Sequence, residues 1–213
     1  MAPPLYGQVV VGPPGSGKTT YCDGMQQYLR LLGRDAWVIN LDPANEIAAS
    51  RGVSASKDGG SDDNDGEAST SNQQLPYETL FDVCEEVVNL SSVMEKLNLG
   101  PNGGLIYCME YLEAHVDEII ETFQSRLPSE KTYLLVDLPG QIELYTHSTC
   151  VQQLLQKLTK VLDLRLTAVQ LIDAHYCSDA EKFLSAALLG TTTMLRLELP
   201  TVSVLSKVDL LSN

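Results

Sequence analysis

The most informative segment of the sequence lies near the N-terminus: Gly12-Pro13-Pro14-Gly15-Ser16-Gly17-Lys18-Thr19. It fits the pattern G-x-x-x-x-G-K-[ST], in which the glycines let consecutive backbone N–H groups point at one anion. A short apolar segment, Gln8 to Val11, precedes it, and apolar residues at helical spacing follow from Lys18 to Leu32. The pattern therefore lies between a strand and a helix, which is the context that a phosphate-binding loop needs, and the helix N-terminus adds its dipole.

The polar side chains at the end of this stretch have expected roles. Lys18 would reach the β- and γ-phosphates of a nucleotide, the Thr19 hydroxyl would ligate Mg²⁺, and Thr20 would contact the α-phosphate. GTPases, ATPases and nucleotide kinases can all open with this loop, so residues that read the base and act on the phosphates must separate these classes.

Strand and helix patterns alternate along the rest of the chain. The expected strands are residues 8–11, 36–41, 133–136, 166–172 and 202–205, and the expected helices are residues 18–32, 91–97, 105–127, 148–161 and 179–197. Gly33 is a candidate C-cap of the first helix, Ser91-Ser92 are the candidate N-cap region of the second, and residues 100–104 end that helix. The alternation predicts the α/β class: a P-loop NTPase with a mostly parallel sheet and helices on both faces, in a single domain over residues 1–213.

One segment, residues 48–74, breaks this pattern. It is rich in Ser, Gly, Asp and Asn and has few large apolar residues, so it cannot offset the entropy of becoming ordered. We expect a disordered surface insertion rather than a linker between two domains, because too little chain precedes it to form a domain.

Composition and charge exclude several classes of function. The formal net charge is −14, and no basic stripe of the kind that binds nucleic acid is visible. The 5 cysteines are widely spaced without a C-x-x-C pair, which favours neither a disulfide framework nor a zinc site. The N-terminus lacks a signal peptide and the apolar runs are too short to span a bilayer, so a soluble intracellular protein is expected.

A second motif follows the strand expected at residues 133–136: Asp137-Leu138-Pro139-Gly140-Gln141. A strand-end aspartate beside a phosphate loop would act on Mg²⁺ through water, and the Gly140 N–H would approach the γ-phosphate. Gln141 and Glu143 could each orient an attacking water. Asp-x-Pro-Gly also forms plain turns, but behind a phosphate loop the catalytic interpretation is favoured.

A second strand-end carboxylate is Asp42, followed by Pro43. The functional interpretation is a ligand of Mg²⁺ or of water, and the alternative is an aspartate that caps or closes a turn. The sequence pattern does not decide between the ligand role and the turn-closing role of Asp42.

The base reader is expected at Ser206-Lys207-Val208-Asp209, after the last apolar strand. The stretch is similar to N-K-x-D, in which a carboxylate accepts from guanine N1–H and the 2-amino group, whereas adenine offers no such pair. The Lys207 stem can pack on the base, and Ser206 stands where Asn is usual, so selectivity would depend on Asp209. The alternative is an exposed polar turn.

Five motifs in order resemble those of the GPN-loop GTPases: residues 12–20, residues 42–45, Gly100-Pro101-Asn102-Gly103-Gly104, residues 137–143 and residues 206–209. The strings Met109-Glu110-Tyr111-Leu112-Glu113 and Asp173-Ala174-His175-Tyr176-Cys177 are most similar to the eukaryotic GPN-loop GTPase 2 subgroup. The resemblance covers nearly the whole chain outside residues 48–74.

The resemblance implies a Mg²⁺-dependent enzyme that binds GTP and GDP and works as a dimer. Asn102 would act on the γ-phosphate in the partner's site, and Asp42, Gln141 and Glu143 match the positions that hold the lytic water. It also implies heterodimers with sibling GPN-loop GTPases, and a role in the assembly of RNA polymerase II and III subunits before nuclear import, in the cytoplasm with shuttling to the nucleus. Direct contact with nucleic acid or membrane is not expected.

Two other hypotheses remain: a non-catalytic nucleotide-dependent binding module, and a nucleotide kinase, against which the residue 137–143 loop and the base reader argue. Only Leu210-Leu211-Ser212-Asn213 follow Asp209. Members of the family run further, so we expect a C-terminally truncated chain whose strand at residues 202–205 is poorly covered, with weak guanine binding and marginal stability.

Overall fold

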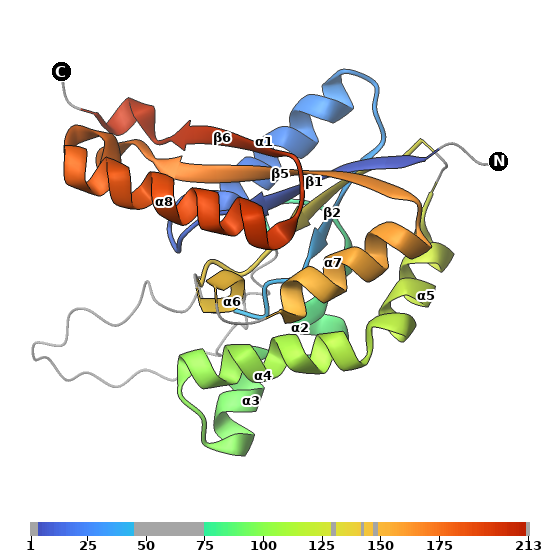
Figure 1. Cartoon of the computed structure of the whole chain (residues 1–213). Helices are drawn as coiled ribbons and strands as arrows, with labels where there is room; N and C mark the ends of the chain where they lie inside the picture. Colours follow the sequence, from blue (N-terminus) through green and yellow to red (C-terminus); the bar gives the residue numbers. More distant parts are fainter. Residues whose placement is uncertain (1–3, 45–74, 129–130, 142, 147–148, 212–213) are drawn as a thin grey trace, which may run out of the picture.

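A parallel sheet of six strands forms the centre of the protein, in the order β3-β2-β4-β1-β5-β6. The computed structural model describes residues 4–44, 75–128, 131–141, 143–146 and 149–211, so the expected insertion at 48–74 lies outside the described residues. Figure 1 shows the strands as one twisted layer between helices. The strands are β1 Leu5–Val11, β2 Ala36–Asn40, β3 Thr79–Asp82, β4 Tyr133–Asp137, β5 Leu164–Asp173 and β6 Thr201–Ser206.

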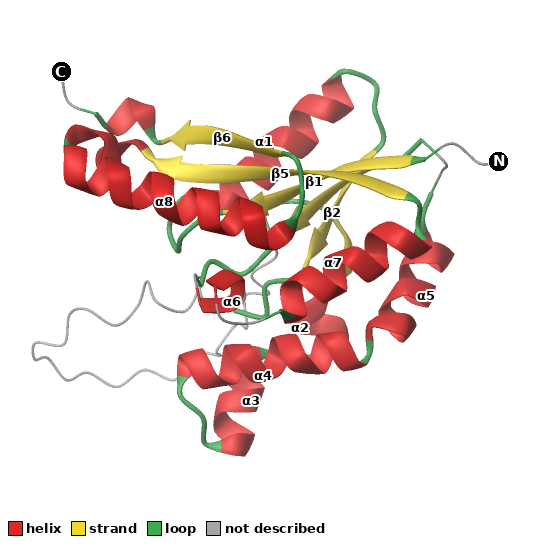
Figure 2. Cartoon of the chain, in the orientation of Figure 1, coloured by secondary structure: helices red, strands yellow, loops and turns green. Residues whose placement is uncertain are grey.

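The helices lie on both sides of this layer, as Figure 2 shows. They are α1 Lys18–Leu31, α2 Val83–Glu86, α3 Leu90–Leu97, α4 Pro101–Ala114, α5 Val116–Arg126, α6 Glu143–Thr146, α7 Cys150–Val161 and α8 Ala180–Leu197. Two short 3₁₀ turns, Ala174–Ser178 and Val208–Leu210, follow β5 and β6. None of the helices in the described ranges has the length and hydropathy that a membrane span requires.

Alternate residues of the central strands supply two separate cores, because successive side chains of a strand point to opposite faces. On the α1 face, Val10 and Leu135 pack with Cys22 of α1. On the other face, Val9 and Val136 belong to the larger cluster, which α4, α5, α7 and α8 cover. Strands buried on both faces are typical of parallel sheets, and this confirms the expected α/β fold with helices on both faces.

The register of the sheet brings the functional strand ends together. Val10 pairs with Asp137 and Asn40 pairs with Asp137, so β1, β2 and β4 end at one level. Asp173 pairs with Ser206 on the other side of β1. The phosphate loop after β1 therefore lies between the β4 carboxylate and the end of β5.

The edge strand β3 and the short helices α2 and α6 were not predicted from the sequence. β3 has only four residues and pairs with β2 alone, with a register shift between Val38 and Ile39. Leu80 and Phe81 form too short an apolar run for a clear period-2 signal. Phe81 packs edge-to-face on Phe123 of α5, with ring centroids 4.8 Å apart, so tertiary packing secures the strand.

Three predictions about the α3–α5 region were wrong. The N-cap of α3 is Asn89, whose side chain accepts from the N–H groups of Ser91 and Ser92. Gly100 does not end α3; Asn98 does, with a φ of 52°, and Gly100 is the N-cap of α4 with Pro101 in its first turn. The expected helix over 105–127 is two helices that meet at His115.

The remaining predicted strands and helices agree with the structure to within a few residues at their ends. Gly33 has a φ of 75° just after α1, and the Arg34 N–H donates to the Leu29 carbonyl, so the predicted C-cap is confirmed. Asp179 caps α8 by accepting from the Glu181 N–H.

Candidate functional site

The phosphate loop joins β1 to α1 as the sequence predicts. Gly15 and Gly17 have φ values of 76° and 92°, a left-handed conformation that glycine adopts without strain. A side chain at Gly12 would place its Cβ 2.6 Å from Ser16 Oγ and 2.8 Å from the Leu171 carbonyl oxygen, so the loop also needs the absence of a side chain there. Pro13 and Pro14 complete the loop.

Lys18 begins α1 and folds back over the loop. Its Nζ donates to the carbonyl oxygens of Gly12 at 3.2 Å and Pro13 at 3.4 Å. The side chain is buried, and burial lowers the pKa of Lys18, whereas the charges of Asp137 and Asp42 raise it. The ammonium group thus donates to two carbonyls of the phosphate loop and lies within electrostatic reach of two carboxylates. Thr20, one position beyond Thr19, is exposed on the first turn of α1.

Asp137 at the end of β4 lies against the first turn of α1. The Thr19 hydroxyl donates to Asp137 Oδ2 at 3.1 Å, and the Tyr77 hydroxyl donates to the same oxygen at 2.9 Å. Burial, followed by the charge of Asp42, raises the pKa of Asp137 to about 6, although Tyr77, Lys18 and Thr19 each lower it. A buried carboxylate with this environment is suited to a cation, which would offset the cost of its burial.

Two buried side-chain oxygens in the described ranges lack a hydrogen-bond partner, and both belong to this site: Ser16 Oγ and Asp137 Oδ1. Unpartnered buried polar atoms cost free energy, so a ligand is the expected explanation. Hydroxyl and carboxylate oxygens are the donors that Mg²⁺ uses, together with water and phosphate oxygens. In the described part of the chain, no three His, Cys, Asp or Glu side chains gather to hold a metal. Mg²⁺ is usually held by one or two carboxylates together with water and phosphate oxygens, and the residues of this site fit that arrangement.

Asp42, at the turn after β2, is held by a network of hydrogen bonds that includes the buried residues Asn40 and Asp82. Asn40 donates through Nδ2 to Asp82 Oδ1 at 2.9 Å and accepts the Asp42 N–H through Oδ1 at 3.1 Å. One Asp42 oxygen accepts the Ala44 N–H at 2.9 Å, which is the turn-closing role that the sequence left open. Burial raises the pKa of Asp42, and its charge acts on Lys18 and Asp137, so the same carboxylate also lies within electrostatic reach of the phosphate site.

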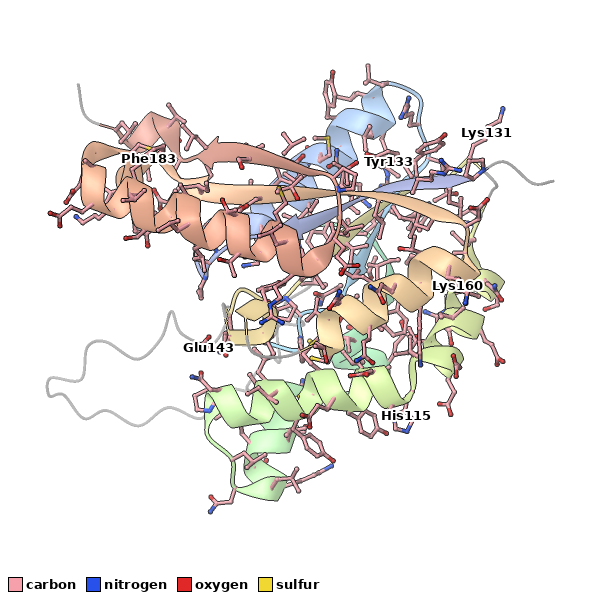
Figure 3. The ribbon with its side chains drawn as sticks, viewed as in Figure 1. His115, Lys131, Tyr133, Glu143, Lys160 and Phe183 are labelled. Carbon is pink, nitrogen blue, oxygen red and sulfur yellow. The ribbon has the colours of Figure 1, made fainter. Side chains whose placement is uncertain are left out.

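Gly140 brings the second motif into contact with the phosphate loop. A Cβ at this position would lie 2.6 Å from Lys18 Nζ and 3.0 Å from Pro14 Cα and N. The Tyr145 hydroxyl, buried, donates to the Pro139 carbonyl and holds the turn. Gln141 follows, half-buried, and Glu143 is exposed on α6, where Figure 3 labels it.

The base-reading stretch follows β6 at the same edge of the sheet. Ser206 Oγ donates to the Ile172 carbonyl oxygen at 3.3 Å, and Lys207 Nζ forms an ion pair with Asp173 Oδ2 at 2.9 Å. The pKa of Asp173 lies below its ordinary value because of the hydrogen bond from Lys207 first, and then that of the His175 N–H. Lys207 has a φ of 58°, and Asp209 is exposed in the 3₁₀ turn that follows.

Asn102 does not join these residues within the chain. It is exposed in the first turn of α4, and α4 packs on α3 and α7. The structure brings Lys18, Thr19 and Asp137 together, with Asp42 nearby, and leaves Asn102 apart. The role of Asn102 in a partner's site stays a prediction.

Several residues that support the site were not predicted from the sequence. Tyr77 contacts Asp137, Asp173 holds Lys207, and Asn40 with Asp82 holds the Asp42 turn. Asp173 and Asn40 could have been noticed, since both are polar residues at strand ends. Tyr77 precedes a strand that the pattern did not reveal, so nothing local marked it.

A solved structure has the same fold. It is that of a GTPase in apo form from Pyrococcus abyssi, with a TM-score of 0.70 and 25% sequence identity, and the likeness covers 98% of this chain and 69% of that one. A family model described as a conserved hypothetical ATP binding protein matches residues 10–50 and 69–213. The match includes every motif of the site.

Curated relatives are similar over nearly the whole chain. GPN-loop GTPase QQT1 of Arabidopsis thaliana is 46% identical over 209 residues, which is 98% of this chain and 60% of that protein. GPN-loop GTPase 2 of Danio rerio is 47% identical and that of Saccharomyces cerevisiae is 36% identical, and this chain spans 56% and 52% of their lengths. On the ordered motifs, the shared fold and these relatives, the chain belongs to the GPN-loop GTPase family.

Proposed function

We propose that this chain binds a guanine nucleotide with Mg²⁺ and hydrolyses GTP. The observation that carries the proposal is the convergence of Lys18, Thr19 and Asp137 beside a glycine loop, where two buried oxygens have no partner among the described residues. A triphosphate with its cation would satisfy both oxygens and would neutralise the buried carboxylate. The name GTPase, which the relatives carry, supports the same activity.

Each residue has a role in this reaction. The loop N–H groups and Lys18 bind the phosphates, while Thr19, Asp137 through water, and Asp42 would hold Mg²⁺, which neutralises charge on the phosphates. A water positioned by Gln141, Glu143 and Asp42 attacks the γ-phosphorus. The new P–O bond forms as the bond to the β–γ bridging oxygen breaks, so GDP leaves with the electron pair and the water proton passes to solvent or phosphate.

The base is read by a carboxylate in this proposal. Asp209 accepts from guanine, and Lys207, held by Asp173, lies along the base plane. The family model's description names ATP and the relatives' names say GTPase. We favour guanine because a carboxylate acceptor matches guanine N1–H and the 2-amino group, and adenine has neither donor at those positions.

The wider role follows from the resemblance. We infer a dimeric switch with a sibling GPN-loop GTPase or a second copy, in which Asn102 approaches the partner's γ-phosphate. Its exposure at the start of α4 supports this. The same resemblance favours work in the cytoplasm, with shuttling to the nucleus, on RNA polymerase II and III subunits.

Binding and hydrolysis can be tested on the purified chain. Fluorescent GDP and ADP analogues should bind with a preference for guanine that Asp209→Asn removes, while affinity for the phosphate part persists. Equal affinity of the unaltered chain for both analogues, or binding of neither, would overturn the proposal.

Gln141→Leu separates catalysis from binding. Loss of the amide that orients water should lower phosphate release by roughly 10²-fold or more, while nucleotide affinity stays within a few-fold. Gln124→Leu is the control, since Gln124 is exposed on α5. If Gln141→Leu leaves phosphate release unchanged, Gln141 does not orient the water. A chain that binds GTP but releases no phosphate, alone or with a sibling protein, would be a non-catalytic binding module.

The dimer is tested by mass in solution. The chain, alone and mixed with a sibling GPN-loop GTPase, should gain mass when a non-hydrolysable GTP analogue replaces GDP. Asn102→Ala in one partner should slow hydrolysis in the other. A monomer under all conditions would exclude the switch.

A further inference from the structure

Tyr77 lies beside the candidate metal site but belongs to none of the sequence motifs. Its side chain is 5% exposed, and its hydroxyl donates to Asp137 Oδ2 at 2.9 Å. The residue stands just before β3, 60 positions from Asp137 along the chain. A buried hydroxyl aimed at the metal-side carboxylate suggests a role in the geometry of that carboxylate.

The two donors on Asp137 fix the orientation of its carboxyl group. Thr19 Oγ1 and the Tyr77 hydroxyl both donate to Oδ2, whereas Oδ1 is buried and has no partner in the described part of the chain. A carboxylate with one oxygen held from two directions cannot rotate freely about its Cβ–Cγ bond. The oxygen left over, Oδ1, is then the atom presented to a cation or to its water.

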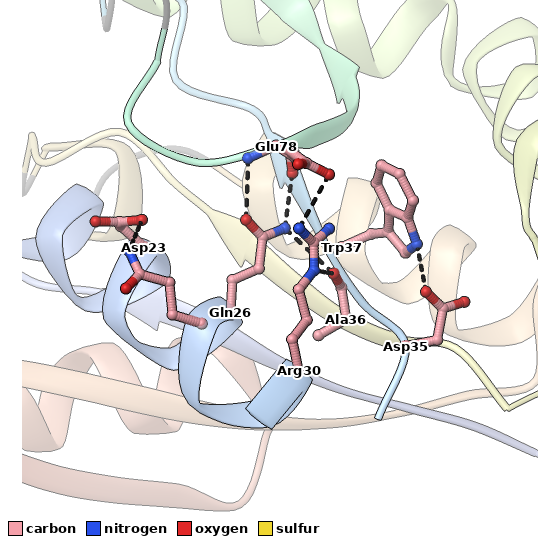
Figure 4. A network of polar contacts seen from close by, with 8 residues as sticks. Asp23, Gln26, Arg30, Asp35, Ala36, Trp37 and Glu78 are labelled. Atoms are coloured by element: carbon pink, nitrogen blue, oxygen red, sulfur yellow. Dashed lines mark hydrogen bonds and ion pairs between the residues drawn. The ribbon is translucent and has the colours of Figure 1, made fainter. Parts of the chain in front are cut away.

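A pair of hydrogen bonds between Gln26 of α1 and the backbone of Glu78, called the Gln26 clamp below, fixes the backbone next to Tyr77. Gln26, buried, donates through Nε2 to the Glu78 carbonyl at 2.8 Å and accepts the Glu78 N–H through Oε1 at 2.9 Å. Figure 4 shows this pair of bonds and the ion pair from Arg30 to Glu78, 2.9 Å long. Because α1 also carries Lys18 and Thr19, one helix holds both the phosphate-binding residues and the backbone next to Tyr77.

The Tyr77 ring is fixed by packing as well. It lies in the apolar cluster of Val10, Cys22, Val38 and Leu135 on the α1 face of the sheet. Phenylalanine would fill the same volume in the same cluster, so packing alone does not require the hydroxyl. The hydroxyl is therefore the part of this side chain that needs a functional explanation.

We infer that Tyr77 is a positioning residue that orients Asp137 for Mg²⁺ in the nucleotide complex. The inference rests on the proposed function and adds to it the residue that aligns the metal-side carboxylate. Groups that hydrogen-bond to metal-side ligands typically change metal affinity by about 10–100-fold when they are removed. Loss of the hydroxyl should weaken Mg²⁺ binding without weakening nucleotide binding in the absence of Mg²⁺.

The test compares Tyr77→Phe with a matched control, Tyr21→Phe. Tyr21 packs against the same cluster, and its hydroxyl donates to Gln8 Oε1 at 3.0 Å, so the control also loses a hydrogen-bonded hydroxyl. Dissociation of N-methylanthraniloyl-GDP is followed by fluorescence while Mg²⁺ is titrated. The midpoint should rise by about 10-fold in Tyr77→Phe and stay within about 2-fold of the unaltered chain in Tyr21→Phe.

Two further readouts separate positioning from a general structural defect. With excess EDTA, the dissociation rate of the GDP analogue should be the same in all three proteins. Phosphate release by Tyr77→Phe should be restored by raising Mg²⁺, since a metal-affinity defect is overcome by mass action and a distorted site is not.

The outcomes distinguish the inference from the proposed function. If the unaltered chain shows Mg²⁺-dependent retention of the GDP analogue and Tyr77→Phe shows the same midpoint, the role of Tyr77 is wrong and the nucleotide proposal stands. If Tyr77→Phe weakens binding equally with and without Mg²⁺, its effect is structural and the inference also fails. If the unaltered chain shows no response to Mg²⁺, the proposed function itself fails.

Discussion

At the scale of single residues, the site is a balance of buried charges. Lys18 and Asp137 are buried, and the charge of Asp42 acts on the pKa of each. A carboxylate that is costly to bury in the nucleotide-free protein is one that gains most from a cation. Stability and metal binding should therefore oppose one another at Asp137.

Asp137→Asn should stabilise the nucleotide-free protein while abolishing its response to Mg²⁺. The pKa of Asp137 is raised from 3.8 to about 6, so folding favours the protonated form, and this contribution is lost as the pH rises through about 6. At about pH 7.5 the variant should be more stable by roughly 1–3 kcal/mol, and the difference should vanish near pH 4. Urea unfolding at several pH values measures it; an asparagine variant that is less stable at neutral pH would contradict the argument.

Gly140→Ala should weaken nucleotide binding. The added Cβ would lie 3.0 Å from backbone atoms of Pro14 and 2.6 Å from Lys18 Nζ, so the two loops must separate or Lys18 must move. Such overpacking costs roughly 1–3 kcal/mol, which corresponds to about 10-fold or more in affinity. Gly24→Ala is the control, because nothing lies within 4 Å of its Cβ on α1 and it should leave affinity unchanged. If Gly140→Ala bound nucleotide as tightly as the unaltered chain, the phosphate loop and the residue 137–143 loop could separate without cost.

At the scale of elements, α1 connects the phosphate loop with the strands β2 and β3. It begins at the phosphate loop, and its Gln26 reaches both β2 and the residue before β3. On the other face, α5 packs on β3 through the Phe81–Phe123 pair, and Arg126 bridges to Glu86 after β3. β3 is a short edge strand, so these contacts from both faces are what hold it.

Gln26→Leu should destabilise the fold by roughly 2–4 kcal/mol, because the Glu78 N–H and the Ala36 and Glu78 carbonyls lose a buried partner. Its neighbour Gln27 is a matched control, since its exposed side chain donates only along the helix to Asp23 at 2.8 Å. Gln27→Leu should change the free energy of unfolding by no more than about 0.5 kcal/mol. Similar urea midpoints for Gln26→Leu and Gln27→Leu would show that the Gln26 clamp does not contribute to the stability of the fold.

At the scale of the whole molecule, negative charge is the dominant surface property. The formal net charge is −14, and the motif residues place positive charge at Lys18 and Lys207, at the nucleotide edge of the sheet. Large apolar side chains are exposed on α8 and β6: Phe183, Leu184, Leu188, Leu195, Val202 and Leu205. The expectation that the strand at 202–205 is poorly covered agrees with this exposure.

Salt should stabilise the protein in the absence of nucleotide. Repulsion among the excess negative charges opposes the compact state, and ions screen it. The midpoint of thermal unfolding should rise by a few degrees between about 10 mM and about 300 mM NaCl, equally in KCl, since the effect depends on ionic strength. A midpoint that falls over this range would mean that local ion pairs, such as Lys207–Asp173, outweigh the net charge.

The fold class, the phosphate loop, Asp137 at a strand end and Asp209 just after the last strand could all be predicted from the sequence. These depend on local patterns: glycines before a helix, and apolar runs followed by polar residues. Which side chains meet became known from the folded chain, because contacts between distant residues leave no local pattern: Tyr77 lies 60 positions from Asp137, Asp82 lies 42 from Asn40, and Lys207 lies 34 from Asp173. The structure also revealed β3, whose four residues are too few for a clear periodic signal, and the break between α4 and α5 at His115.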